Sequence, residues 1–272
     1  MPILADYHLH SSYSGDSEAS MEAMIQKAIS MGLKYICFTE HMDLDFPPED
    51  DTPVDKFETN VDAYLYDLLR IRNKYVNDIT VGFGLELGLQ PHLVRRNVKV
   101  AKEHDFDFII GSAHICNGRD PYYPSFFEGR PEEEAIREYF ECIYENLRAY
   151  SNFDVFGHMD YIVRYAPSRD KDYCYEKYAD ILDKILERLI SREKGLEINT
   201  GAVAYNLREM NPCNAILRRY HEMGGELITV GSDAHTVEDM GRGFDIAEQI
   251  LKDCGFKYYT VYDGRIPIMQ KL

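Results

Sequence analysis

Long apolar runs are absent from the sequence. The apolar runs that it has are all much shorter than the roughly 20 residues that a membrane-spanning helix requires, so we expect no membrane span. The first six residues also lack the basic and apolar regions of a signal peptide. The six cysteines are scattered without a Cys-x-x-Cys pair, which favours small buried thiols. Together these absences predict a protein of a reducing, cytoplasmic compartment.

Positive charge is also scarce. Lysine and arginine number 30 against 47 aspartates and glutamates, which gives a net charge of −17. Such a chain would repel nucleic acid and an anionic membrane, so we expect neither as a partner. The sequence lacks the Gly-x-x-x-x-Gly-Lys-Ser/Thr phosphate loop and the Gly-x-Ser-x-Gly nucleophile elbow. It does not fix the oligomeric state, and a homo-oligomer stays open.

Short apolar strands alternate with longer stretches of helical periodicity. The expected strands are residues 3–8, 35–39, 80–86, 106–114, 153–158, 195–200 and 226–232, with one more at 258–262. The expected helices are residues 21–31, 61–76, 92–103, 132–150, 175–193, 212–223 and 239–254. This alternation is typical of an α/β protein with a parallel sheet. The length of 272 residues fits closure of that sheet into one barrel, a single domain over residues 1–272.

Four long segments follow expected strands. In a barrel they would lie at the C-terminal ends of the strands, where barrel enzymes build their sites. A single segment of this kind is usually a solvated connection, but four on one face predict a substrate enclosure. They are residues 42–58, 115–131, 164–172 and 201–212.

Histidines and carboxylates recur at these strand ends. His8 and His10 are two residues apart on the first strand, so both side chains point the same way and can bind one metal ion. The same spacing returns as Asp233 and His235 after the last strong strand. Asp16 follows shortly after the first strand, and four further candidates lie at or soon after other strand ends, namely His41, Glu86, His114 and His158. We expect ordinary surface or packing roles for the helical histidines His92, His104 and His221.

The motifs occur in the order of a known family. They are His8-Leu9-His10-Ser11, Ser14-Gly15-Asp16, Glu40-His41, Glu86, Gly111-Ser112-Ala113-His114, Gly157-His158 and Asp233-Ala234-His235. In this combination the chain resembles the polymerase and histidinol phosphatase (PHP) superfamily over nearly its whole length. Three stretches resemble the histidinol-phosphatase branch, namely Thr39-Glu40-His41-Met42-Asp43, Gly118-Arg119-Asp120 after His114, and His158-Met159-Asp160-Tyr161-Ile162-Val163-Arg164. The resemblance implies a distorted (β/α)7 TIM-like barrel with its active site at the C-terminal ends of the strands.

The resemblance also implies two or three divalent metal ions. Zinc, manganese and iron all suit a site with mixed imidazole and carboxylate ligands. His8, His10, Glu86 and Asp233 would bind the first ion. Glu86 would bridge to the second ion, which His114 and His158 complete. Asp16, His41 and His235 would bind the third. Some family members carry a histidine where Asp16 stands, so this third site is the least fixed by the pattern.

A phosphate monoester fits the charge of such a centre. Three divalent ions outweigh the carboxylates of Asp16, Glu86 and Asp233, and a dianionic ester would be attracted. The branch resemblance implies hydrolysis of L-histidinol phosphate to L-histidinol and inorganic phosphate in histidine biosynthesis. A hydroxide bridging two ions would attack phosphorus in line, with Glu86, Asp233 and Arg164 as the catalytic residues.

Substrate contacts are expected from the long segments. Arg164 and Arg208 are candidates for phosphate binding, with a surface ion pair as the alternative role. Asp43, Asp45 and Asp120 are candidates for the ammonium and imidazole groups, with a solvated loop acid as the alternative. Four aromatic residues could cover the imidazole ring or pack the loop core, namely Tyr122, Tyr123, Phe126 and Phe127.

Three other functions stay open on the sequence. The nearest is a PHP phosphoesterase for a nucleotide, a sugar phosphate or a phosphotyrosine. An amidohydrolase-like C–N hydrolase also begins with His-x-His. The additional set Asp16, His41 and His235, and the lack of a candidate carboxylated lysine, disfavour it. A metal-storage or metal-sensing barrel would bind metal without turnover.

Overall fold

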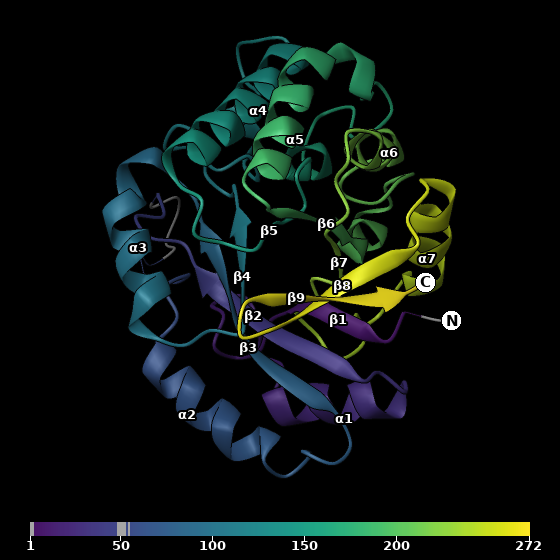
Figure 1. The fold of residues 1–272 in the computed structure, drawn as a ribbon. Helices are drawn as coiled ribbons and strands as arrows, with labels where there is room; N and C mark the ends of the chain where they lie inside the picture. The colour runs from purple at the N-terminus through teal and green to yellow at the C-terminus, as the bar shows by residue number, and fades with distance from the viewer. Residues whose placement is uncertain (1–2, 48–52, 54) are drawn as a thin grey trace.

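Seven parallel strands form a nearly closed barrel in the computed structural model, which describes residues 3–47, 53 and 55–272 (Figure 1). The strands pair in chain order and are β1 (Ala5–Leu9), β2 (Tyr35–Met42), β3 (Thr80–Gly88), β4 (Phe108–Ser112), β5 (Val155–Phe156), β6 (Gly195–Asn199) and β7 (Ile228–Gly231). The ends of β1 and β7 meet through the Asp233 amide, which donates to the His8 carbonyl at 2.9 Å, and the His10 amide, which donates to the Ala234 carbonyl at 3.0 Å. The α/β barrel expected from the sequence is therefore confirmed.

Helices alternate with the strands and cover the outside of the barrel (Figure 1). They are α1 (Met21–Ser30), α2 (Val61–Arg72), α3 (Val94–Glu103), α4 (Glu132–Ala149), α5 (Ala179–Ser191), α6 (Asn214–Glu222) and α7 (Phe244–Asp253). The buried face of α5, for example, is an apolar stripe of Ile181, Leu182, Ile185, Leu186 and Leu189. Within the described ranges, no helix combines the length and apolar composition needed to cross a bilayer.

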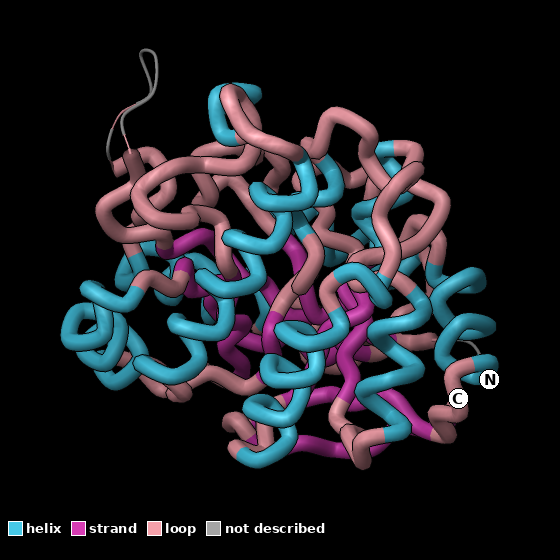
Figure 2. Tube along the Cα trace, turned by 90° about the horizontal axis from the view of Figure 1, so that it is seen from above, coloured by secondary structure: helices cyan, strands magenta, loops and turns pink. Residues whose placement is uncertain are grey.

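The segments that follow the strands gather at one end of the barrel (Figure 2). Short 3₁₀ helices stiffen several of them, namely η2 (Pro124–Phe126), η3 (Tyr161–Arg164) and η5 (Thr200–Tyr205); two others, η1 (Pro91–Leu93) and η4 (Tyr175–Lys177), precede α3 and α5. Residues 48–52 and 54 of the expected 42–58 segment lie outside the described residues.

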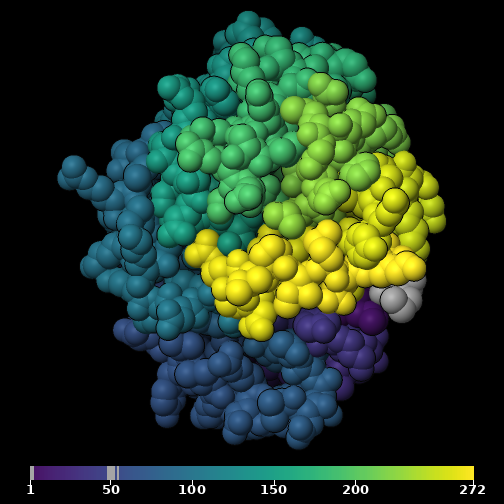
Figure 3. Space-filling view, in the orientation of Figure 1, coloured from purple at the N-terminus to yellow at the C-terminus, as the bar shows by residue number. Residues whose placement is uncertain are grey.

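A C-terminal hairpin crosses the opposite end of the barrel (Figures 2 and 3). It consists of β8 (Tyr258–Asp263) and β9 (Ile266–Lys271), which pair only with each other. Tyr7 donates its hydroxyl to the Tyr262 carbonyl at 2.8 Å, and the rings of Phe108 and Tyr262 lie 4.9 Å apart. The expected strand at 258–262 is confirmed, but it closes the base of the barrel instead of joining its wall.

Several expected boundaries differ from the structure. The helix expected at 239–254 begins only at Phe244, because Gly241 and Gly243 adopt positive φ angles of 64° and 78°. The fifth strand contains only Val155 and Phe156 of the expected 153–158. The helix expected at 175–193 is divided into η4 and α5.

Removal of the Arg265 side chain should destabilise the hairpin closure. Arg265 lies in the hairpin turn, and its Nε is 2.5 Å from the buried carboxylate of Asp154. We expect Arg265→Ala to lower the free energy of unfolding by about 1–3 kcal/mol, because Asp154 loses its cation. Urea denaturation measures this free energy of unfolding. Arg70→Ala, which breaks an exposed pair with Asp67, is the control and should change it by less than about 0.5 kcal/mol. Equal effects of the two substitutions would contradict the interpretation.

Candidate metal centre

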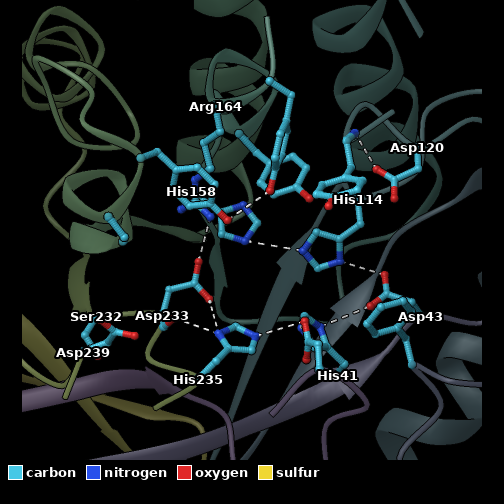
Figure 4. Close-up of a pocket in the computed structure, with 18 of the residues that line it drawn as sticks. His41, Asp43, His114, Asp120, His158, Arg164, Ser232, Asp233, His235 and Asp239 are labelled. Atoms are coloured by element: carbon cyan, nitrogen blue, oxygen red, sulfur yellow. Dashed lines mark hydrogen bonds and ion pairs between the residues drawn. The ribbon is translucent and has the colours of Figure 1, made fainter. Parts of the chain in front are cut away.

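All nine predicted ligands lie together at the C-terminal ends of the strands. Six sit at or just beyond strand ends: His8 and His10 at β1, His41 at β2, Glu86 at β3, His114 after β4 and His158 after β5. Asp233 and His235 follow β7, and Asp16 lies in the segment between β1 and α1. Figure 4 shows how the side chains of His41, His114, His158, Asp233 and His235 point into one cavity. The closed strand order explains this convergence, since parallel strands end on the same face.

Glu86 occupies the centre of the cluster. Its Oε1 lies 2.9 Å from His158 Nε2 and 3.2 Å from His114 Nε2. Its Oε2 lies 3.0 Å from His41 Nδ1, 3.3 Å from His8 Nε2 and 3.5 Å from His10 Nε2. The two oxygens therefore face different sets of imidazoles, as a carboxylate that bridges two ions must.

Two further carboxylates complete the cluster. Asp233 Oδ1 lies 3.5 Å from both His8 Nε2 and His10 Nε2. Asp16 Oδ2 lies 3.3 Å from His235 Nε2 and 3.6 Å from His41 Nε2. Among the described residues, four groups of three side chains bring their ligand atoms within 4.8 Å of one another. These groups are His10–His41–His235, His8–His10–Asp233, His8–Glu86–His158 and His41–Glu86–His114.

The donor atoms of the cluster fit divalent cations. Within the described residues, His8 Nε2, His10 Nε2 and Glu86 Oε2 are buried and have no hydrogen-bond partner. Buried polar atoms are rarely left in this state in a folded protein. Imidazole nitrogens with carboxylate oxygens are the ligands that zinc, manganese and iron accept. Bound cations would satisfy all of these atoms at once.

Outer hydrogen bonds orient the imidazoles. His10 Nδ1 lies 2.9 Å from the Ser14 hydroxyl, which donates to the buried carboxylate of Glu40 at 2.6 Å. His114 Nδ1 lies 2.8 Å from Asp43 Oδ1. Such partners fix the ring orientation and the tautomer of a metal-binding histidine. Asp43 is thus buried behind His114 as well as being part of the cavity wall.

Arg164 is held rigidly beside the cluster. Its guanidinium donates to Asp233 Oδ2 at 3.0 Å, Asn199 Oδ1 at 2.8 Å and Asn211 Oδ1 at 2.9 Å. The guanidinium carbon also lies 5.4 Å from the ring centre of Tyr161 and 5.1 Å from that of Tyr205. Arg164 is buried, yet it lines the cavity over the metal ligands.

A cavity of about 620 Å³ opens above the ligands, which is within the range of small-molecule sites. Its wall includes the predicted substrate residues Asp43, Asp120, Tyr122, Tyr123 and Arg164. Aromatic residues that the sequence did not single out also line it, namely Phe46, Phe57, Tyr161, Tyr165 and Tyr205. The arrangement places cation-binding groups at the floor and aromatic rings at the sides.

Comparison with known proteins identifies the family. The PHP domain model matches residues 6–201, which is more than half of the chain. The chain belongs to the PHP domain family. The matched segment holds seven of the nine predicted ligands.

Relatives of this PHP-domain chain include curated phosphatases. A probable histidinol-phosphatase of Clostridium acetobutylicum is 31% identical over 94% of this chain and 95% of its own length. The histidinol-phosphatase of Lactococcus lactis is 32% identical over 95% of this chain and 94% of its own length. A crystal structure of histidinol phosphate phosphatase from L. lactis, complexed with zinc, L-histidinol and phosphate, has a TM-score of 0.87, 31% identity and coverage of 97% and 98%.

Some predicted site residues lie elsewhere in the PHP barrel. The side chain of Arg208 is 62% exposed, pairs with Asp170 and is not among the cavity-lining residues of the described chain. Asp45 is exposed and pairs with Arg96. Phe126 is fully buried and Phe127 lies beside it, away from the cavity wall. The placement of these four residues fits the alternative roles of surface ion pairing and loop packing.

The helical histidines lie away from the centre. His92 is exposed beside Asp45, His104 lies near Asp62, and the ring of His221 packs 4.7 Å from Phe256. Sequence reasoning gave no role to Glu40 or Glu197, although both are fully buried near the ligands. Glu197 lies among the apolar residues of a buried strand, and this position is a signal that could have identified it.

The carboxylates of the cluster raise the pKa of His8, His41, His114 and His235, whereas burial lowers the pKa of His10 and His158. Burial lowers the pKa of His114, but the carboxylates of Asp43 and Glu86 outweigh it and raise that pKa to about 10. Burial likewise lowers the pKa of His41 and is outweighed by Asp16 and Glu86, so the pKa is well above its usual range. Burial raises the pKa of Glu86, but His8, His114 and His41 hold it well below the usual value. Without metal, His41 and His114 are therefore imidazolium groups beside carboxylates, whereas the lowered pKa values of His10 and His158 favour neutral rings.

Metal binding should consequently release protons. A raised pKa means that His41 and His114 hold protons at pH 7, whereas a metal ion needs the neutral ring. We expect zinc binding to release at least about one proton per protein at pH 7, and the affinity to increase as the pH rises. Calorimetric titration in buffers of different ionisation enthalpy measures this number. Binding without proton release, or an affinity that falls with rising pH, would contradict it.

Proposed function

We propose that this protein hydrolyses L-histidinol phosphate to L-histidinol and inorganic phosphate, a step of histidine biosynthesis. The observation that carries the proposal is the cluster of nine histidine and carboxylate side chains, six of which line one cavity. The comparisons support the substrate, because a solved relative is complexed with zinc, L-histidinol and phosphate. Its similarity to this protein extends over 97% of this chain and 98% of the relative's chain.

We assign the ligands to three ions, which zinc, manganese or iron would suit. The first ion takes His8, His10, Glu86 and Asp233. The second takes Glu86, His114 and His158, and the third takes Asp16, His41 and His235. The groups His8–His10–Asp233 and His10–His41–His235 support the first and third sites, although His8, His10, His41 and Glu86 each belong to two groups. The second site is supported by the 3.5 Å between His114 Nε2 and His158 Nε2, which both face Glu86 Oε1.

Divalent ions in this position would neutralise the charge on phosphate oxygens and lower the pKa of water so that it can attack phosphorus. The chain's own residues attract and orient the ester. Arg164 brings a permanent positive charge to the cavity wall, and its three fixed partners hold the guanidinium in place. The tyrosine rings and the carboxylate of Asp120 offer an aromatic and acidic side for the imidazole and ammonium groups.

The whole chain works as one domain in this proposal, because the ligands extend from His8 to His235 and the C-terminal hairpin closes the base of the barrel. The six cysteines are all unpaired, which supports a reducing, cytoplasmic setting. The net charge of −17 supports a small-molecule substrate over nucleic acid.

Steady-state hydrolysis tests the substrate. We expect kcat/KM for L-histidinol phosphate to exceed that for a nucleoside monophosphate, a sugar phosphate and phosphotyrosine by at least about 10²-fold, because a site built to hydrogen-bond one substrate rejects analogues that lack those groups. Release of inorganic phosphate measures each rate. A preference for one of the other esters would contradict the proposed substrate but leave the phosphatase activity in place. Metal binding without any hydrolysis would support a storage or sensing protein.

A further inference from the structure

Glu197 is a buried carboxylate in the interior of β6. The side chain of Glu197 is 1% exposed and lies between the ends of β5 and β7. Its Oε1 is 2.6 Å from His8 Nδ1, and its Oε2 accepts a hydrogen bond from the His158 amide at 2.8 Å. Asn199 Nδ2 donates to the same Oε2 at 3.1 Å. Both oxygens are therefore engaged, and Glu197 is absent from the four groups of adjacent ligand atoms.

The two groups that Glu197 contacts belong to different ions in the ligand assignment. His8 is a ligand of the first ion, and its Nδ1 must carry the proton that the carboxylate accepts, which leaves Nε2 free for metal. His158 is a ligand of the second ion, and its backbone has a φ of 20°, which few non-glycine residues adopt. The bond to the His158 amide holds this backbone in place.

The neighbouring strands leave room for this carboxylate. A Cβ atom at Gly231, the last residue of β7, would lie 2.3 Å from Glu197 Oε1 and 2.4 Å from the Cβ of His8. Glycine at position 231 therefore permits the contact between His8 and Glu197. A buried carboxylate needs such engaged partners, because desolvation of an unpaired charge is costly.

We propose that Glu197 is a positioning residue that links the ligands of the first and second ions into one unit. The inference rests on the metal assignment of the proposed function, and it is independent of the identity of the substrate. One carboxylate orients the His8 ring through Oε1 and the His158 backbone through Oε2, so loss of its geometry changes both sites together. The third site, formed by Asp16, His41 and His235, has no contact with Glu197 among the described hydrogen bonds and ion pairs.

Glu197→Gln separates this role from simple filling of space. The amide has nearly the same shape but only one acceptor oxygen, so its NH₂ group must face either the His158 amide or His8 Nδ1. In the first arrangement two hydrogen-bond donors face each other, the NH₂ group of the glutamine and the His158 amide. The second forces His8 to accept at Nδ1 and to carry its proton on Nε2, the atom that should bind metal. Either arrangement disturbs one of the two ion sites directly, and the other ion is weakened with it because Glu86 is assigned to both ions and contacts both His8 and His158.

Titration of metal-free protein with Zn²⁺ tests the proposal. We expect Glu197→Gln to weaken two of the bound ions together by about 10- to 100-fold, the usual effect of removing an outer partner of a metal ligand. The third ion should keep its affinity; Asp16→Asn identifies its step in the titration. Asp154→Asn removes another buried carboxylate, at the opposite end of the barrel, and should leave all ion affinities unchanged.

Glu197→Asp provides a second variant if the glutamine protein does not fold. It keeps the charge but is one methylene shorter, so it cannot reach both His8 and His158, and both ions should again be weakened. Wild-type affinities in either folded variant, a loss restricted to one ion, or an equal loss in Asp154→Asn would overturn the role of Glu197. Absence of Zn²⁺ binding in the wild-type protein would instead overturn the proposed function and the assignment on which this inference rests.

Discussion

Replacement of Glu86 by glutamine should lower kcat/KM for phosphate ester hydrolysis by more than about 100-fold, because removal of an outer partner alone costs up to that much. Both oxygens of Glu86 face imidazole nitrogens, at 2.9–3.5 Å. The amide of glutamine would present a donor to one of these sets and would remove the charge that two cations share. Both ions next to Glu86 should therefore be lost or weakened.

Metal analysis beside steady-state kinetics measures this effect. Circular dichroism should show an unchanged barrel, since glutamine has the shape of glutamate. Asp154→Asn is the matched control, because it also neutralises a buried carboxylate but lies beside Arg265 at the other end of the barrel. Normal metal content and turnover in Glu86→Gln would exclude Glu86 as a bridging ligand.

Replacement of Arg164 by alanine should lower kcat/KM by about 10²- to 10³-fold, as for loss of one preorganised donor in an active site. The substitution removes the positive charge from the cavity wall and leaves Asp233 without its partner at Oδ2. Arg164→Lys should recover little of the lost kcat/KM, because a single ammonium group cannot replace the planar guanidinium that reaches Asp233, Asn199 and Asn211.

Arg208→Ala is the matched control for Arg164. Both arginines belong to segments that follow strands, but Arg208 is mostly exposed and pairs with Asp170. Its removal should change kcat/KM by less than about twofold, since an exposed ion pair contributes little. The same loss in both variants, or full activity in Arg164→Ala, would contradict the function assigned to Arg164.

The barrel was predictable because its strands are short, apolar and regularly spaced. All seven expected strands are present, and their C-terminal ends bring eight of the nine ligand candidates together, with Asp16 joining them from the segment between β1 and α1. The β8–β9 hairpin was predicted only in part. Its second strand, Ile266–Lys271, is largely exposed and packs no apolar face into the barrel, so hydrophobic periodicity gave it no clear signal.

The inner site was more predictable than the cavity wall. Ligands such as His41 and Glu86, which are paired in the β2–β3 register, are placed by a strand pattern that the sequence reveals. Arg164 and Arg208 are alike in the sequence, and only the folded chain shows that one is buried beside Asp233 and the other is in solvent. Tyr161 and Tyr205 come from separate segments, so their approach to Arg164 depends on tertiary packing.

Anomalous diffraction from a crystal grown with Mn²⁺ tests most directly whether distant strand ends form one metal centre. We predict two separate anomalous peaks in contact with the carboxylate of Glu86. One peak should also contact His114 and His158, and the other should also contact His8, His10 and Asp233. A further peak should lie between Asp16, His41 and His235. A map without peaks at these side chains, or with manganese bound only at surface carboxylates, would contradict the metal centre and the hydrolytic function assigned to it.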